Sequence, residues 1–207
     1  MGEPVEYPFI RGIEGFPVIT PVIKLEHERI NFGGVWHTDT TYLDEPPKGT
    51  MLLACEVPPQ GGDTIFANQY LAYEALSDGL RRTLDTLCGI SSSAKADVSK
   101  SREDRMASAP AARANEVLTA EHPVVRTHPE TGRKALFINP GHTVRFKDWT
   151  EAESTPLLEF LHQHQRKEEF TCRFNWHPGS LALWDNRAVQ HFAVPDYDGE
   201  RVMQRLV

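Results

Sequence analysis

The chain has 207 residues, 40% of them hydrophobic and 25% charged, which is typical of one globular domain with an apolar core. A net charge of −7 argues against nucleic acid as a partner, because phosphate binding requires a basic surface. No apolar run is long enough to cross a membrane, no signal peptide is evident, and Cys55, Cys88 and Cys172 form no C-x-x-C pair, so we expect a cytoplasmic protein with reduced, mostly buried thiols.

The first half of the chain contains strand candidates and one helical region. Prolines interrupt the extended segment 16–25, which favours a position at a sheet edge. The apolar run 49–57 lies between proline-rich turns and predicts a buried strand. Leucines and alanines at helical spacing predict a helical region over 67–87, with a break at Gly79. Residues from about 90 to 121 are weakly patterned, and we expect a mobile lid or insertion there.

The second half of the chain is richer in strands. Segment 122–139 predicts two strands around a turn at Glu130–Gly132. Thr150 and Glu153 fit a capping box at the start of a helix over 150–164. Four short strand candidates follow: 170–176, 180–185, 188–194 and 201–207. Because strands dominate without β-α-β alternation, we predict a mainly β fold, an antiparallel sandwich or jelly roll with helical insertions.

The stretch GGVWHTDTTYL, residues 33–43, places His37 and Asp39 two residues apart among strand-forming residues. In a strand, residues i and i+2 point to the same face about 6–7 Å apart, so both side chains could reach one metal ion. A solvated strand face would produce the same pattern. H-x-D alone is therefore a weak signal, and a third ligand has to be sought.

Histidines supply the candidates for that third ligand. His191 lies in the otherwise apolar strand candidate 188–194, either as a core histidine bonded to a backbone carbonyl or as a second imidazole ligand. His142, after Asn-Pro-Gly, is a weaker candidate. Two histidines and one carboxylate leave three metal positions open, an arrangement typical of non-haem Fe(II) oxygenases, whereas structural zinc requires four ligands. We expect the following histidines at surface turns or on the polar side of a helix: His122, His128, His177, His162 and His164.

Two arginines occupy one face of the last strand candidate. Arg201 and Arg205 are four residues apart with Met203 between them, which separates them by about 13 Å along a strand. A solvated strand face is one interpretation. The other is a pair of carboxylate-binding arginines, because the planar guanidinium suits bidentate anion contacts. One would then bind the far carboxylate of an oxo-diacid and the other an anionic substrate.

Four stretches, in their order and spacing, resemble the taurine dioxygenase family of Fe(II)/2-oxoglutarate-dependent dioxygenases, which includes phenoxyalkanoate and alkylsulfate dioxygenases. They are WHTDTTYL, PPQGGDTIFANQYLAYEALS, HPVVRTHPETGRKALFIN and LWDNRAVQHFAVPDYDGERVMQR. The resemblance runs from about residue 30 to the end of the chain. It implies a double-stranded β-helix, a cupin-like jelly roll whose two sheets enclose the iron.

The resemblance also implies roles for single residues. The iron ligands, and with them the catalytic centre, would be His37, Asp39 and His191. Thr64 would help to hold 2-oxoglutarate, and Arg201 would pair with its far carboxylate. Trp184 matches an aromatic residue beside the metal and cosubstrate, and Arg205 matches an arginine that faces a substrate anion.

Two departures from the family pattern bear on substrate and fold. Taurine-specific members carry amide side chains just before the H-x-D stretch, where this chain has Phe32, Gly33 and Gly34. The two glycines leave volume at the substrate site, so we expect a larger and more apolar substrate than taurine. Members also carry a longer N-terminal region, whereas 36 residues precede His37 here, so we expect an N-terminally short jelly roll.

These observations predict a single Fe(II)/2-oxoglutarate dioxygenase domain over residues 1–207. It would use O2 to hydroxylate a small anionic substrate of the aryloxyalkanoate, alkyl sulfate or sulfonate type, releasing succinate and CO2. A truncated, non-catalytic metal- or ligand-binding member of the same fold is the alternative. A jelly-roll isomerase or hydrolase with another metal ranks last, because it gives no account of Thr64 and Arg201. No membrane partner is expected, and a homo-oligomer is left open.

Overall fold

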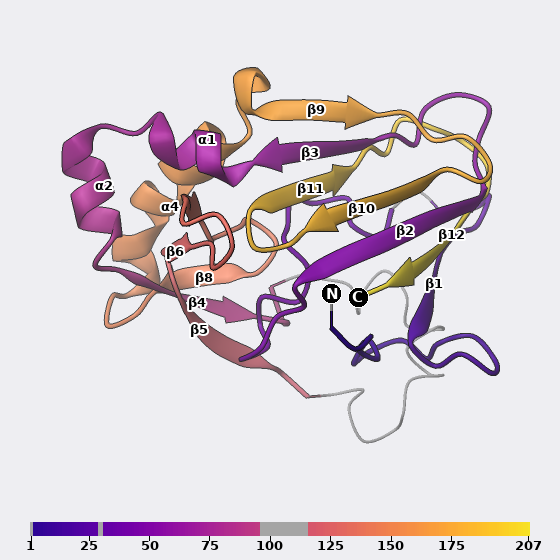
Figure 1. The fold of residues 1–207 in the computed structure, drawn as a ribbon, viewed down its shortest axis with the longest axis horizontal. Coiled ribbons are helices and arrows are strands. Elements are labelled where there is room, and N and C mark those ends of the chain that lie inside the picture. The colour runs from indigo at the N-terminus through magenta and orange to yellow at the C-terminus, as the bar shows by residue number, and fades with distance from the viewer. Residues whose placement is uncertain (1, 29–30, 96–115) are drawn as a thin grey trace.

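The computed structural model describes residues 2–28, 31–95 and 116–207, and antiparallel strands dominate it (Figure 1). The larger sheet has four strands in the spatial order β1 (Ile19–Lys24), β12 (Arg201–Leu206), β2 (Gly49–Glu56) and β10 (Leu181–Asp185). A second sheet has the order β11 (Val189–Ala193), β3 (Thr64–Asn68) and β9 (Thr171–Phe174). The predicted mainly β architecture is confirmed, and the site described below lies between these two sheets.

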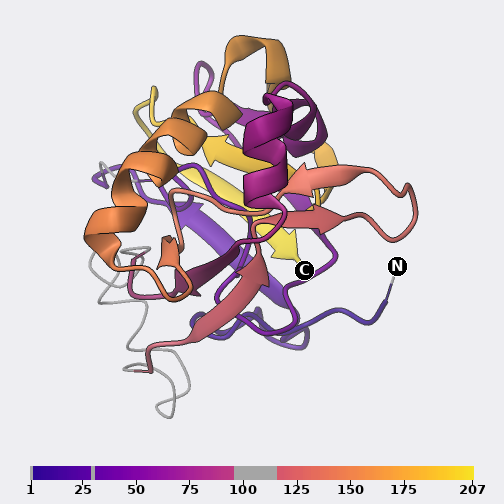
Figure 2. The ribbon, with the colours of Figure 1, turned by 90° about the vertical axis from the view of Figure 1, so that its left-hand side faces the viewer.

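The remaining elements gather at one end of the molecule. The third sheet has the order β5 (Thr119–Pro123), β4 (Cys88–Ser92) and β8 (Thr143–Phe146), and β6 (Val125–Thr127) pairs with β7 (Lys134–Leu136). The helices within the described ranges are α1 (Gln69–Glu74), α2 (Asp78–Leu84) and α4 (Glu151–Gln165), with a 3₁₀ turn, η1, at Glu168–Phe170. They lie on the left in Figure 1 and face the viewer in Figure 2.

Local signals in the sequence account for the positions of most elements. Strand β1 lies at the edge of its sheet, as its prolines predicted. The helical region breaks at Ala75–Ser77 and not at Gly79, because Ser77 caps α2 and Gly79 lies in its first turn. Strands β4 and β5 occupy the two ends of the expected insertion, and residues 96–115 lie outside the described part of the chain.

The predicted capping box of α4 is present. The Thr150 hydroxyl accepts a hydrogen bond from the Glu153 backbone N–H at 3.2 Å, and the Glu153 carboxylate accepts one from the Thr150 backbone N–H at 2.8 Å. Two donors at the helix start are thereby satisfied. The helix then packs Leu158 and Leu161 into the core beneath it.

Three histidines expected on the surface are buried instead. Each ring finds a partner from a distant part of the chain: His122 bonds the Leu43 carbonyl, His128 the Asp185 carboxylate and His164 the Ala72 carbonyl, at 2.9, 2.9 and 2.7 Å. Such partners satisfy these three buried imidazoles, and a local sequence pattern cannot reveal them. His162 is half-buried, and His177 is exposed as expected.

The cysteines differ from the expectation in burial but not in pairing. All three are free, yet Cys55 and Cys88 are half-buried and Cys172 is exposed, so the expectation of mostly buried thiols was wrong. In β2 the inward positions alternate, and Cys55 follows the buried Ala54, which turns its side chain away from the core.

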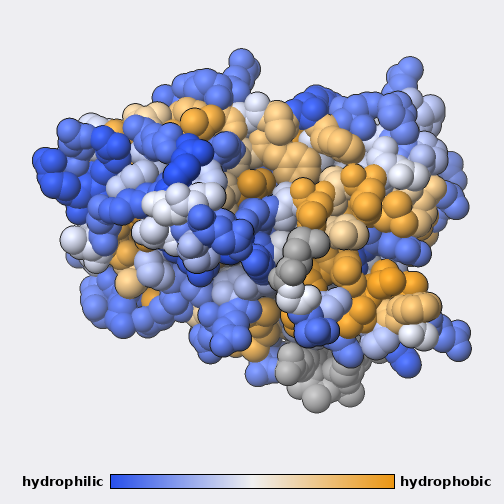
Figure 3. Space-filling model, viewed as in Figure 1, coloured by the Kyte–Doolittle hydropathy of each residue, from blue (hydrophilic) through white to orange (hydrophobic). Residues whose placement is uncertain are grey.

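Apolar side chains are also found outside the core. Leu181 and Leu183 on β10 are each more than half exposed, and Figure 3 shows apolar surface over β10 and β2. None of the helices in the described ranges is long and apolar enough to span a lipid bilayer.

Candidate functional site

A single β-bridge brings the two ends of the predicted metal set together. His37 and His191 exchange backbone hydrogen bonds, at 3.0 Å from His37 N to His191 O and 2.8 Å in the reverse direction. Directly opposed residues of an antiparallel pair point to the same side, and the two imidazole centroids lie 4.2 Å apart. The stretch around His37 was predicted as a strand, but only this isolated bridge forms, opposite the middle residue of β11.

Asp39 completes the cluster. Its Oδ1 lies 3.5 Å from His37 Nε2 and 3.9 Å from His191 Nε2, and one ligand atom from each of the three residues lies within 4.8 Å of the others. The chain turns directly after Asp39, at Thr40, whose φ is +46°. A left-handed β-branched residue is strained by about 1–3 kcal/mol, and such strain is typical of functional sites.

Hydrogen bonding and burial prepare these groups to bind a cation. His37 Nδ1 bonds the Val35 carbonyl at 2.7 Å, so Nδ1 donates a proton to that carbonyl and Nε2 faces Asp39 at 3.5 Å. Burial, followed by the nearby His37, lowers the pKa of His191 to about 3, so this ring is neutral near pH 7. Burial raises the pKa of Asp39, but His191, His37 and Arg205 together hold it well below its ordinary value. The set therefore contains an ionised carboxylate and the neutral ring of His191, which is the state in which these two groups bind a metal.

Arg201 and Arg205 lie on the buried face of β12 with Met203 between them, as their spacing predicted. Both are only 5% exposed, which excludes the solvated strand face. Burial lowers the pKa of the Arg201 guanidinium, and its Nε and Nη2 have no hydrogen-bond partner among the described residues. A buried guanidinium with unused donors fits an anionic ligand.

A small cavity joins these arginines to the histidines. Its lining includes His37, His191, Thr64, Arg201 and Arg205, and its volume is about 30 Å³. That is room for little more than one water, so a dicarboxylate requires the lining side chains to move.

Trp176 was not singled out in the sequence, and it orients one wall of this cavity. Its indole N–H donates to the Thr64 hydroxyl at 3.0 Å. An indole only donates, so the proton of the Thr64 hydroxyl stays available to an acceptor in the cavity.

The other predicted site residues divide into those beside the cavity and those away from it. Trp184 lines the cavity and packs on His191, with ring centroids 4.7 Å apart. Gly33 also lines it, at φ +79°, and a Cβ there would meet His37 Cε1 at 3.1 Å. Gly33 thus leaves room for the His37 ring itself. Gly34 is not among the lining residues, and a Cβ there would meet the Asn31 carbonyl instead.

His142 stays outside the cluster. Its ring lies edge-on to Tyr42 and to His37, with centroids 4.9 and 6.1 Å away. Burial, then the nearby His37, lowers its pKa to about 3. It therefore packs as a neutral ring beside His37.

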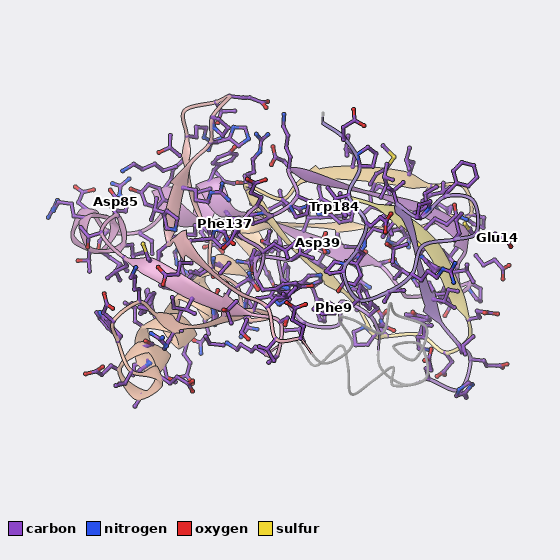
Figure 4. The ribbon with its side chains drawn as sticks, turned by 90° about the horizontal axis from the view of Figure 1, so that it is seen from below. Phe9, Glu14, Asp39, Asp85, Phe137 and Trp184 are labelled. Carbon is purple, nitrogen blue, oxygen red and sulfur yellow. The ribbon has the colours of Figure 1, made fainter. Side chains whose placement is uncertain are left out.

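Thr50 and Asn186 contact the site although the sequence analysis did not select them. The Thr50 hydroxyl donates to Asp39 Oδ2 at 2.6 Å, and Asn186 Nδ2 donates to Thr50 Oγ1 at 2.8 Å. Figure 4 shows Asp39 and Trp184 in the middle of the molecule, with Asp85 and Glu14 at its two ends. A lone threonine within the apolar run 49–57 was the available signal.

Comparison with known proteins agrees with this arrangement. Residues 9–207 match the family described as "Taurine catabolism dioxygenase TauD, TfdA family". An alpha-ketoglutarate-dependent sulfate ester dioxygenase of Pseudomonas putida is 36% identical over 214 residues, which cover 100% of this chain and 68% of that protein. The chain therefore belongs to the TauD/TfdA family of alpha-ketoglutarate-dependent dioxygenases.

Solved structures show the same fold. A taurine dioxygenase from Burkholderia xenovorans superimposes with a TM-score of 0.79 at 35% identity, over 99% of this chain and 66% of that one. AAD-2 in complex with Mn(II) and N-oxalylglycine gives a TM-score of 0.71 at 29% identity, over 84% of this chain and 68% of that one. The chain spans about two thirds of the length of the relatives it matches.

Proposed function

We propose that this chain is an Fe(II)- and 2-oxoglutarate-dependent dioxygenase with His37, Asp39 and His191 as the iron ligands. The observation that carries the proposal is the convergence of their three ligand atoms within 4.8 Å, beside a cavity that is lined by His37 and His191 and by a buried, incompletely bonded arginine. Two imidazoles and one carboxylate leave coordination positions open for other ligands. When bound, Fe(II) and 2-oxoglutarate supply the activation of O2, with succinate and CO2 as products.

The residues of this chain bind and orient the cosubstrate. Arg201 presents Nε and Nη2 to the far carboxylate of 2-oxoglutarate, since no described residue uses them. Thr64 directs its hydroxyl proton to the same ligand, because its oxygen already accepts from Trp176. Trp184 covers the His191 ring and limits access of water to it.

The fold proposed for this activity is the double-stranded β-helix over residues 1–207. Its two sheets correspond to β1-β12-β2-β10 and β11-β3-β9, and the cavity is lined by residues of both.

We infer a small anionic substrate, recognised by Arg205. Arg205 Nη1 lies 3.4 Å from Asp39 Oδ1, while Nε and Nη2 have no described partner. The guanidinium lies over the rings of Tyr7 and Phe32, at 4.4 and 5.1 Å. It does not pair with Asp196, which bonds Arg173. An anion bound at this arginine would lie beside aromatic rings, which suits alkyl sulfates, sulfonates or aryloxyalkanoates.

Succinate formation tests the reaction. Wild-type protein with Fe(II), O2 and 2-oxoglutarate should release succinate. Removal of a hydrogen-bond partner of a metal ligand costs up to roughly a hundredfold in activity, so the rate of succinate formation should fall by more than that in His191→Ala, which lacks the ligand itself. Folded wild-type protein that binds Fe(II) without forming succinate would favour the alternative, a non-catalytic metal-binding member of the fold.

The substrate class is tested with a panel of alkyl sulfates, sulfonates and aryloxyalkanoates. Arg205→Ala should raise KM for the accepted anion more than KM for 2-oxoglutarate. Arg133→Ala serves as the matched control, because Arg133 pairs with Glu74 on the surface. An Arg205→Ala variant that weakens only 2-oxoglutarate would contradict the assignment.

A further inference from the structure

A chain of hydrogen bonds leads from the cavity wall to the far oxygen of Asp39. Trp184 Nε1 donates to Asn186 Oδ1 at 3.0 Å, and Asn186 Nδ2 donates to Thr50 Oγ1 at 2.8 Å. Thr50 Oγ1 donates to Asp39 Oδ2 at 2.6 Å. All four side chains are buried, so water does not compete for these bonds.

The direction of each bond in this chain follows from its first donor. An indole N–H can only donate, so Asn186 presents its oxygen to Trp184 and its amino group to Thr50. The Thr50 hydroxyl has one proton and already accepts from Asn186. That proton therefore points to Asp39 Oδ2, and the oxygen can only accept it.

The two oxygens of Asp39 consequently have different surroundings. Oδ2 faces the Thr50 hydroxyl, whereas Oδ1 faces the Nε2 atoms of His37 and His191 at 3.5 and 3.9 Å. Thr50 lies on the inward face of β2, and Asn186 follows β10, the neighbouring strand. The backbone N–H of Asn186 bonds the Lys48 carbonyl, which anchors the turn.

We propose that Thr50, held in place by Asn186, is a positioning residue that keeps Asp39 as a one-oxygen metal ligand through Oδ1. This role rests on the proposed metal site. Without the hydroxyl, the carboxylate is free to rotate or to offer both oxygens, and the buried Asn186 amino group loses its acceptor. Loss of a hydrogen-bond partner of a metal ligand weakens metal binding about 10–100-fold.

Anaerobic Mn(II) titration of the full chain, followed by the electron paramagnetic resonance of free Mn(II), tests the role. Thr50→Val, which keeps the shape and removes the hydroxyl, should weaken Mn(II) binding about 10–100-fold. Thr50→Ser, which keeps the hydroxyl, should bind Mn(II) with an affinity close to that of the wild type. Thr143→Val is the matched control, because Thr143 is equally buried and its hydroxyl bonds the Asn139 backbone N–H. Its melting temperature should fall while its Mn(II) affinity stays that of the wild type.

A double-mutant cycle separates positioning from general loss of stability. Asn186→Leu should weaken Mn(II) binding in the wild type but add little in the Thr50→Val background, because Asn186 acts through Thr50. Each of three results would overturn the proposal. Thr50→Val could bind Mn(II) with wild-type affinity, the losses of affinity in the cycle could be additive, or Thr143→Val could lose as much affinity as Thr50→Val. If His191→Ala binds Mn(II) as the wild type does, the metal site is wrong. If only His191→Ala loses affinity, the metal site stands and the positioning role fails.

Discussion

Two buried regions of this molecule have opposite chemistry. The helix core, packed beneath α1, α2 and α4, is apolar, with Leu84, Phe146 and Leu161 fully buried. The sheet interior, between the two larger sheets, buries Asp39 and Arg201 together with other charged and polar groups. Some of those polar atoms have no partner within the described chain.

The difference separates stability from binding. Buried apolar surface stabilises the helix core by about 25 cal/mol per Å². Buried charge without a full set of partners costs free energy, and a ligand that supplies those partners recovers it. The sheet interior therefore lowers the stability of the ligand-free protein and favours the binding of a ligand that pairs with its charged groups. Three measurements test this contrast.

Acidification should have the largest effect. Most of it should come from His142 and His191, in and beside the sheet interior, and a further part from His162 of α4, whose pKa burial also lowers to about 3. Burial, then the nearby His37, lowers the pKa of His142 and of His191 to about 3, while the unfolded chain binds protons at these groups below about 6.5. The unfolded state therefore carries more protons between these values, and stability falls as pH drops from about 6.5 to about 3. The loss is about 1.4 kcal/mol per pH unit for each histidine.

Urea unfolding of the metal-free protein at several pH values measures this loss. His142→Asn should reduce the slope by one proton, because the amide does not titrate. A slope that is unchanged in this variant would exclude His142 as its source.

Phe146→Ala should have the next largest effect, in the helix core. Phe146 is fully buried, and its truncation leaves a cavity that costs about 3–5 kcal/mol of unfolding free energy. Mn(II) affinity, measured at a temperature where the variant stays folded, should not change. A parallel loss of affinity would show that the two regions are coupled.

Arg201→Ala should have the smallest effect on stability and a selective effect on binding. Truncating one partner of a buried charge pair costs about 2–5 kcal/mol, so KM for 2-oxoglutarate should rise by at least about thirtyfold. The melting temperature without ligand should hold or rise, because Nε and Nη2 of Arg201 have no described partner to lose. Lower stability with unchanged KM would assign Arg201 to the fold instead. For Arg201→Lys, which keeps the charge, KM for 2-oxoglutarate should lie between the values of the wild type and of Arg201→Ala.

The sequence alone was enough to identify the elements that depend on local signals. The capping box of α4 and the shared face of Arg201 and Arg205 follow from spacing over a few residues, and both are present. The choice of His191 over the other histidines followed from one imidazole in an apolar strand, together with the family resemblance. These features depend on the helix and strand periods, which are properties of the backbone.

The way in which the ligand groups are held depends on contacts between distant segments of the chain. The His37–His191 bridge joins residues 154 positions apart, and the Thr50–Asn186 bond joins residues 136 positions apart. The same holds for the buried His122, His128 and His164, whose partners come from distant segments. A polar side chain in an apolar run is compatible with either a local or a long-range partner. The pairing of strands selects between them, since it sets which distant atoms come within hydrogen-bonding distance.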